Sequence, residues 1–213
     1  MSVQTQSVQA QSVQTQSRAI PATAASRGRI APVKFAHIVF RSGQKDAMVA
    51  WYRTVFEADV SLANPFLTFL TFDHEHHRIA IVGQAGLKAQ DRETAAMEHC
   101  AFTYASLADL LATFKRLRAL AITPYWCINH GPNLSFYYRD PDGNQVELQV
   151  DVFATNEAIE AWYAEGDFLN NPIGVQFDAD DLIRRFEAGE PEAQLMTRPR
   201  ISQDQVLAQL PRG

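Results

Sequence analysis

The chain has 213 residues, a net charge of −5 and a pI near 5.7, and 46% of its residues are hydrophobic. This length suits one domain or two small fused modules with an ordinary globular core. The sequence has no Lys/Arg cluster of the kind that follows a phosphate backbone, and its apolar runs are too short to span a bilayer, so neither nucleic acid nor a membrane is an expected partner. Its two cysteines, Cys100 and Cys127, form neither a disulfide framework nor a zinc motif, which favours a cytoplasmic location.

The first 32 residues differ in composition from the rest of the chain. Residues 2–17 repeat Ser, Val, Gln and Thr with a five-residue period and contain no aromatic residue, Leu or Ile. Such a segment buries too little apolar surface to offset the entropy of ordering, so we expect disorder there. Residues 18–32 contain Pro, Gly and Ser and are expected to form a linker, so the folded module begins near Val33.

One helix among several strands is expected after Val33. The β-branched and aromatic residues over 33–40 predict a strand, and apolar residues at helical spacing predict a helix over 44–56. A polar stretch over 84–96 closes this set of elements. Between the helix and that stretch we expect three short strands, at 58–63, 65–72 and 77–83.

The same order of elements then recurs. A strand is expected at 97–104 and a helix at 106–120, with Ser106 as its N-cap. Three further strands are expected at 122–128, 133–139 and 144–150.

The recurrence predicts an α+β fold of two tandem βαβββ repeats, at 33–83 and 97–150, that form a cupped mixed sheet. The module is expected to span 33–152. Residues 153–213 become acidic and helical in pattern, and we expect a helical C-terminal extension there, packed on the module or on a partner subunit.

Two of the six histidines, His37 and His99, occupy equivalent places in the two repeats. Each falls in the expected first strand, three residues before a phenylalanine, so the repeat symmetry predicts that they lie close together. Glu147 is the third candidate ligand, because alternation along its strand puts it on one polar face with Gln145 and Gln149.

Two imidazoles and one carboxylate leave three coordination positions of a metal open. This is the facial triad of non-haem Fe(II) oxygenases, so the expected cofactor is Fe(II), with Mn(II) as a possible substitute. The first-repeat position that matches Glu147 is Ala80, and a fourth protein ligand is therefore not expected.

The duplicated unit and the segment FYYRDPDGNQVEL (136–148) resemble the vicinal oxygen chelate superfamily, which includes glyoxalase I, bleomycin and fosfomycin resistance proteins, and type I extradiol dioxygenases. Within it, the chain looks most like the small, single-module extradiol dioxygenases that act on 2,3-dihydroxybiphenyl and related catechols. The resemblance covers about residues 33–152.

This resemblance implies roles for individual residues. The metal ligands would be His37, His99 and Glu147, with Tyr137 spaced ten residues before Glu147 as in the extradiol enzymes. The segment HHRIAI (76–81) resembles the family's HHxxA strand and makes His77 the acid–base histidine, while Tyr137 would hydrogen-bond a substrate oxygen. His130 resembles a second active-site histidine.

The expected function is ring cleavage of a catechol-type substrate with O2, in a homo-oligomer. Two alternatives stay open at this point. One is a glyoxalase-like metal-dependent isomerase or thiol transferase, although such sites generally carry a fourth protein ligand, where this chain has Ala80. The other is a metal-free small-molecule-binding resistance protein.

Overall fold

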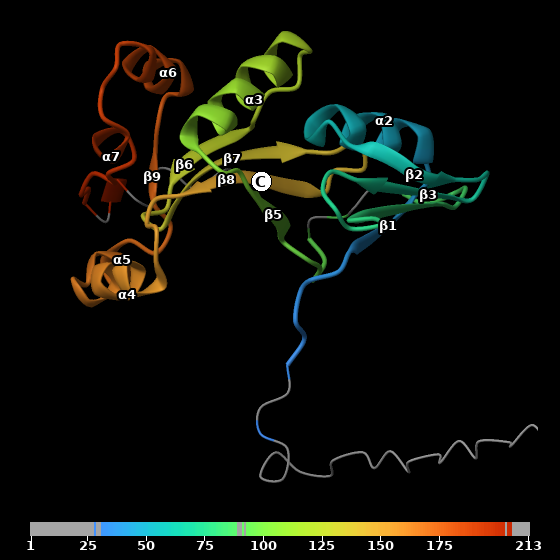
Figure 1. The fold of residues 1–213 in the computed structure, drawn as a ribbon, viewed down its shortest axis with the longest axis horizontal. Coiled ribbons are helices and arrows are strands. Elements are labelled where there is room, and N and C mark those ends of the chain that lie inside the picture. Colours follow the sequence, from blue (N-terminus) through green and yellow to red (C-terminus); the bar gives the residue numbers. More distant parts are fainter. Residues whose placement is uncertain (1–27, 29–30, 89–90, 92, 203, 206–213) are drawn as a thin grey trace, which may run out of the picture. The chain divides into compact units, whose positions relative to one another are not determined.

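The computed structural model describes residue 28 and residues 31–88, 91, 93–202 and 204–205 (Figure 1). The disorder expected for the N-terminus concerns residues that lie almost entirely outside this set. The chain divides into two compact units, residues 1–35 and residues 36–213, and the elements below all belong to the second. No helix among the described residues is long and apolar enough to cross a membrane.

The first half of this unit is a four-stranded sheet with one helix. The strands lie in the order β1-β4-β3-β2, with β1 parallel to β4 and the other neighbours antiparallel. The elements are β1 (Ile38–Ser42), α2 (Lys45–Phe56), β2 (Asp59–Ala63), β3 (Leu67–Thr71) and β4 (Ile79–Gly83).

The second half repeats this arrangement and adds one strand. Its sheet has the order β5-β8-β7-β6-β9, and β5 is parallel to β8 as β1 is to β4. The elements are β5 (His99–Thr103), α3 (Leu107–Ala119), β6 (Trp126–Asn129), β7 (Asn133–Arg139), β8 (Gln145–Asp151), and, from the C-terminal extension, β9 (Val175–Gln176).

The strand registers confirm the duplicated βαβββ unit and the α+β class. Val39 pairs with Ala80 in the first half, and Ala101 pairs with Glu147 in the second, so Ala80 and Glu147 are structurally equivalent. The strands divide into two mixed sheets rather than one continuous sheet. The first strand starts at Ile38, later than the sequence pattern suggests, because Ile79 of β4 is its first pairing partner.

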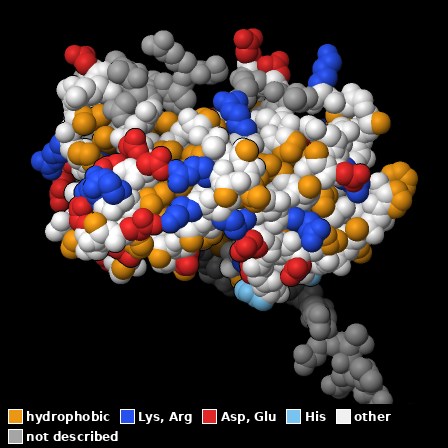
Figure 2. Space-filling model, turned by 90° about the horizontal axis from the view of Figure 1, so that it is seen from above, with side chains coloured by type: hydrophobic (Ala, Val, Ile, Leu, Met, Phe, Trp, Pro, Cys, Tyr) orange, Lys and Arg blue, Asp and Glu red, His pale blue; other side chains and the backbone are white. Residues whose placement is uncertain are grey.

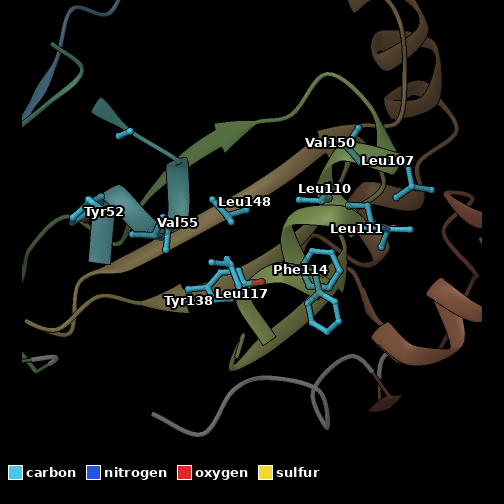
Figure 3. Close-up of a cluster of buried hydrophobic side chains, with 14 of the residues drawn as sticks. Tyr52, Val55, Leu107, Leu110, Leu111, Phe114, Leu117, Tyr138, Leu148 and Val150 are labelled. Carbon is cyan, nitrogen blue, oxygen red and sulfur yellow. The ribbon is translucent and has the colours of Figure 1, made fainter. Parts of the chain in front are cut away.

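Both repeat helices lie on the same side of their sheets (Figure 1). The helix α3 starts at its expected N-cap, where the Ser106 hydroxyl accepts a hydrogen bond from the backbone N–H of Asp109 at 3.1 Å. The apolar faces of α2 and α3 bury against the sheets in a common core (Figure 3). Its members include Tyr52, Val55, Leu107, Leu110, Leu117, Tyr138 and Leu148.

Buried contacts on the helix side join the two halves. The Tyr52 hydroxyl of α2 donates a hydrogen bond to Asp140 Oδ2 at 3.0 Å, in the Asp-Pro-Asp-Gly-Asn turn between β7 and β8. Gly143 adopts a φ of 85° in this turn, a conformation that favours glycine. The rings of Phe56 and Phe102 lie 4.4 Å apart across the same junction. These contacts fix the edge-to-edge placement of the halves.

The C-terminal extension packs on the second half. Besides β9 it contains helices, and Leu182, Ile183 and Leu195 enter the core. The Trp162 side chain packs so closely on Gly131 that a Cβ there would lie 2.3 Å from the indole ring. Up to residue 202 these helices are α4 (Asn156–Ala164), α5 (Asp167–Asn170), α6 (Ala179–Glu187) and α7 (Glu192–Leu195).

The helix-covered surface carries interspersed charges of both signs (Figure 2). Ion pairs such as Lys115–Glu187 and Arg118–Asp180 tie α3 to α6 across it. The polar residues of interest for function lie on the opposite faces of the two sheets.

Candidate active site

The second sheet presents a polar row on the face opposite α3. Ala101, Glu147, Tyr137 and Trp126 are register partners on four adjacent strands, so their side chains share this face. His99, at the start of β5, lies on the same face because it is two residues before Ala101. Three of the predicted site residues therefore come together here.

The Glu147 carboxylate is held by hydrogen bonds at both oxygens and is only 3% exposed. Its Oε2 lies 3.0 Å from Nε2 of His99. Its Oε1 accepts hydrogen bonds from the Ser135 hydroxyl at 2.6 Å and from Asn133 Nδ2 at 2.9 Å. Burial raises the pKa of Glu147, but the hydrogen bonds from His99 and Ser135 outweigh it and the net pKa is lowered. The carboxylate is therefore preorganised as an anion.

His130 and Tyr137 form a second pair on this face. His130 Nδ1 is hydrogen-bonded to the backbone carbonyl of Ile173, and a carbonyl can only accept, so Nδ1 carries the proton. Nε2 is therefore the acceptor, and the Tyr137 hydroxyl donates to it at 3.0 Å. Burial lowers the pKa of His130 and, together with Glu147, raises that of Tyr137. Both groups are neutral near pH 7.

A separate pair of histidines belongs to the first half. His77 is 7% exposed, and its ring stacks on Phe69 at a centroid distance of 4.0 Å. The His37 ring lies 4.4 Å from that of His77. Burial is the main cause that lowers the pKa of His77, followed by the nearby His37 and His76. His77 is therefore a neutral imidazole with one face against an apolar ring.

The three predicted ligands do not all come together in one chain. His37 is exposed and lies one residue before β1, beside His77, whereas His99 faces Glu147 on the other sheet. The charged neighbours that most affect the pKa values of His99 and Glu147, including Glu98 and His130, belong to the second half. Among the described residues, no three His, Cys, Asp or Glu side chains are grouped as metal ligands.

The side chains of His99, Glu147 and His37 are of types that bind a metal ion, although the three residues are divided between the two halves. A buried carboxylate oxygen that faces an imidazole nitrogen is a two-donor half-site for a divalent transition metal. Within a single chain the third donor, His37, is not part of it. The structure therefore places two of the three expected ligands on the second sheet and the third, His37, just before the first strand of the other sheet.

The model of the Glyoxalase/Bleomycin resistance protein/Dioxygenase superfamily matches residues 34–148. The chain belongs to this superfamily. Biphenyl-2,3-diol 1,2-dioxygenase 2 of Rhodococcus globerulus is 40% identical to it over 165 residues, which cover 77% of this chain and 87% of that protein. Biphenyl-2,3-diol 1,2-dioxygenase 3 of the same organism is 41% identical over 167 residues, covering 78% and 88%. A lactoylglutathione lyase structure from Agrobacterium tumefaciens is 23% identical, with a TM-score of 0.46, covering 56% of this chain and 94% of that one.

The candidate site of this superfamily member also contains three residues that its sequence pattern did not single out. Ser135 and Asn133 stand two and four residues before Tyr137, so strand alternation alone would have put them on its face. The third, Arg198, donates hydrogen bonds to the backbone carbonyls of His130 at 2.9 Å and Asn171 at 2.8 Å, and its guanidinium lies 4.8 Å from the centre of the Trp162 ring. No sequence signal marks Arg198, because its role depends on how the extension folds back.

Proposed function

We propose that this protein is an extradiol dioxygenase that opens a catechol-type ring, such as that of 2,3-dihydroxybiphenyl, and places both atoms of O2 in the product. The observation that carries the proposal is the common sheet face on which the His99–Glu147 pair meets the Tyr137–His130 pair. The two relatives named as biphenyl-2,3-diol 1,2-dioxygenases support the same reaction class.

The proposed cofactor is one Fe(II) ion, with Mn(II) as the alternative, bound by His37, His99 and Glu147. Such an ion would bind the catechol oxygens and O2 and would supply the redox chemistry of the reaction. Ala80 at the position equivalent to Glu147 supports an open site, since an alanine offers no ligand. The same residue disfavours a glyoxalase-type site with four protein ligands.

The surrounding side chains are suited to proton transfer and orientation. His77, kept neutral by burial, accepts a proton from a substrate hydroxyl and later returns it to the leaving oxygen. Tyr137 hydrogen-bonds one substrate oxygen, and the unprotonated Nε2 of His130 keeps its hydroxyl oriented. Phe69 adds an apolar wall beside His77 that suits an aromatic ring.

The test is anaerobic loading with Fe(II), followed by addition of 2,3-dihydroxybiphenyl and O2. We expect a yellow ring-opened product and about one O2 consumed per ring, because both oxygen atoms enter the product. The matched control substrate is 2-hydroxybiphenyl, which lacks the second hydroxyl and is expected to give neither colour nor O2 uptake. His77→Gln should lower kcat by about 10²–10⁴-fold, the usual contribution of a general acid–base. Absence of O2 uptake across a panel of substituted catechols would refute the proposal.

A further inference from the structure

His130 lies where three segments of the second half meet. It belongs to the loop between β6 and β7, and the C-terminal extension reaches this loop at residues 171–174 and again at residues 196–198. The first approach brings the backbone carbonyl of Ile173 to His130 Nδ1. The second brings the Arg198 side chain to the backbone of His130. Both contacts therefore come from a part of the chain outside the duplicated unit.

A buried turn holds the Ile173 carbonyl toward His130. The Asn171 side chain, 6% exposed, accepts hydrogen bonds from the backbone N–H of Ile173 at 3.2 Å and of Gly174 at 2.8 Å. It also donates one to the Gly174 carbonyl at 2.8 Å. Gly174 adopts a φ of 122°, and a Cβ there would lie 2.5 Å from the Asn129 carbonyl oxygen, so the turn packs directly on the end of β6. The position of the Ile173 carbonyl therefore depends on Asn171.

Arg198 joins this turn to the loop that carries His130. Its Nη1 atom donates hydrogen bonds to the backbone carbonyl of Asn171 at 2.8 Å and to that of His130 at 2.9 Å. Its guanidinium also lies over the Trp162 ring, which packs on Gly131, the next residue in the loop. One side chain therefore holds together the two segments that form the hydrogen bond between the imidazole and the carbonyl.

The consequence for the site is the tautomer of His130. A neutral imidazole carries one ring proton, and the hydrogen bond at one nitrogen decides which nitrogen is left as an acceptor. Because Nδ1 donates to the Ile173 carbonyl, Nε2 accepts from the Tyr137 hydroxyl at 3.0 Å. If the carbonyl moved away, the ring proton would be free to move to Nε2, and the tyrosine would lose its acceptor.

We propose that Arg198 is a positioning residue for the reaction: by joining the turn to the loop, it keeps His130 in the tautomer that orients the Tyr137 hydroxyl. Arg198 acts only through the backbone and is not itself a catalytic residue. Its importance for turnover rests on the proposed function, in which Tyr137 hydrogen-bonds a substrate oxygen. The duplicated unit thus supplies the imidazole and the phenol, and the C-terminal extension decides where the imidazole proton lies.

The test uses Arg198→Met, which keeps an unbranched side chain beside Trp162 and removes the hydrogen-bond donors. Heteronuclear NMR of the histidine-labelled full-length protein, without added metal, distinguishes protonated from unprotonated ring nitrogens. The chain has six histidines, so the His130 signals are assigned by their loss in His130→Asn. We expect a protonated Nδ1 in the wild type and a mixture of the two tautomers in Arg198→Met. If a thermal melt shows that this variant is unfolded, Arg198→Lys replaces it, with a smaller change expected in the same direction.

The matched control is Arg200→Met, two residues later in the same segment. Arg200 forms ion pairs with Asp167 at 2.8 Å and Glu165 at 3.7 Å, and its side chain is 73% exposed. This control should leave both the His130 tautomer and the turnover unchanged. In the iron-loaded enzyme, Arg198→Met should lower kcat per folded protein by about 10–100-fold, because a misplacement of about 1 Å can cost about 100-fold.

The outcomes separate this proposal from the proposed function. A wild-type tautomer in Arg198→Met, or an equal change in Arg200→Met, would overturn the positioning role and leave the dioxygenase proposal standing. A wild-type His130 with its proton on Nε2, or mixed tautomers with unchanged kcat, would overturn the positioning role as well. Mixed tautomers in Arg198→Met, together with a wild type that turns over no catechol, would support the link between Arg198 and His130 and overturn the dioxygenase.

Discussion

The two repeats have the same backbone register but different side chains on their functional faces. In the second half, the row across the sheet is Ala101, Glu147, Tyr137 and Trp126. The equivalent row in the first half is Val39, Ala80, Phe69 and Leu62. One face therefore holds a buried anion and a phenol, and the other is an apolar wall next to two histidines.

This difference shows that the two repeats of one chain can keep the same backbone and carry different kinds of functional side chain. A buried carboxylate is tolerated only where donors satisfy it, and Ser135 provides one for Glu147. The residue equivalent to Ser135 in the first half is Leu67, whose side chain has no hydrogen-bond donor. A carboxylate at Ala80 would thus lack the hydroxyl donor that Glu147 has, while the apolar wall is available to an aromatic substrate.

The largest expected effect comes from removing the charge that distinguishes the two rows. Glu147→Gln keeps the side-chain volume but removes the anionic ligand, so the Kd for Mn(II) should rise by more than about 100-fold, since loss of an outer partner alone costs about 10–100-fold. The matched control, Ala80→Ser at the equivalent position, should leave the Kd unchanged. Equal effects of the two substitutions in a metal titration would mean that the halves are not specialised in this way.

A smaller effect is expected from the donors that hold the carboxylate. Asn133 donates to Glu147 Oε1 at 2.9 Å and also contacts Gln149 Oε1 at 2.6 Å. Asn133→Ala should weaken Mn(II) binding by about 10–100-fold, because the carboxylate loses part of its orientation. Gln149→Met removes the other acceptor and leaves the hydrogen bonds of Glu147 in place, so it serves as the control. Unchanged Mn(II) affinity of Asn133→Ala would show that the Asn133 hydrogen bond is not needed to position the carboxylate.

The contact between the halves gives a stability prediction. Tyr52→Phe removes the hydrogen bond to Asp140 and leaves a buried carboxylate with one donor fewer, which should lower the free energy of unfolding by about 1–3 kcal/mol. The control is Tyr163→Phe, since Tyr163 is 41% exposed and its change should stay within about 0.5 kcal/mol. Urea denaturation measures both values. A Tyr52→Phe variant as stable as the control would mean that the junction depends on ring packing alone.

Local sequence patterns predicted most helices and strands, but they did not predict how the proposed metal ligands are placed relative to one another. The helical spacing of apolar residues predicted α2 and α3, and Ser106 caps α3 as expected. Symmetry predicted that His37 and His99 lie close together, but His37 lies beside His77 and His99 beside Glu147. The placement of one sheet against the other depends on buried contacts such as Tyr52–Asp140, which no local pattern reveals. For the same reason β9 was missed, because two residues join β6 only after the extension folds back.

Thiol labelling measures the accessibility of one half only, because both cysteines of the chain belong to the second half. Burial raises the pKa of Cys100 to about 11 and that of Cys127 to about 12. The thiolate is the nucleophile, so a raised pKa lowers the reactive fraction, by about 10²-fold or more at pH 8.5 relative to a free cysteine. Iodoacetamide should therefore label the folded protein slowly and the guanidinium-unfolded protein at both sites, with mass spectrometry as the measurement. Because Cys100 interacts with Tyr52 and Asp140, faster labelling of Cys100 in Tyr52→Phe would report opening of the junction, whereas faster labelling of Cys127 would report opening of the second half itself.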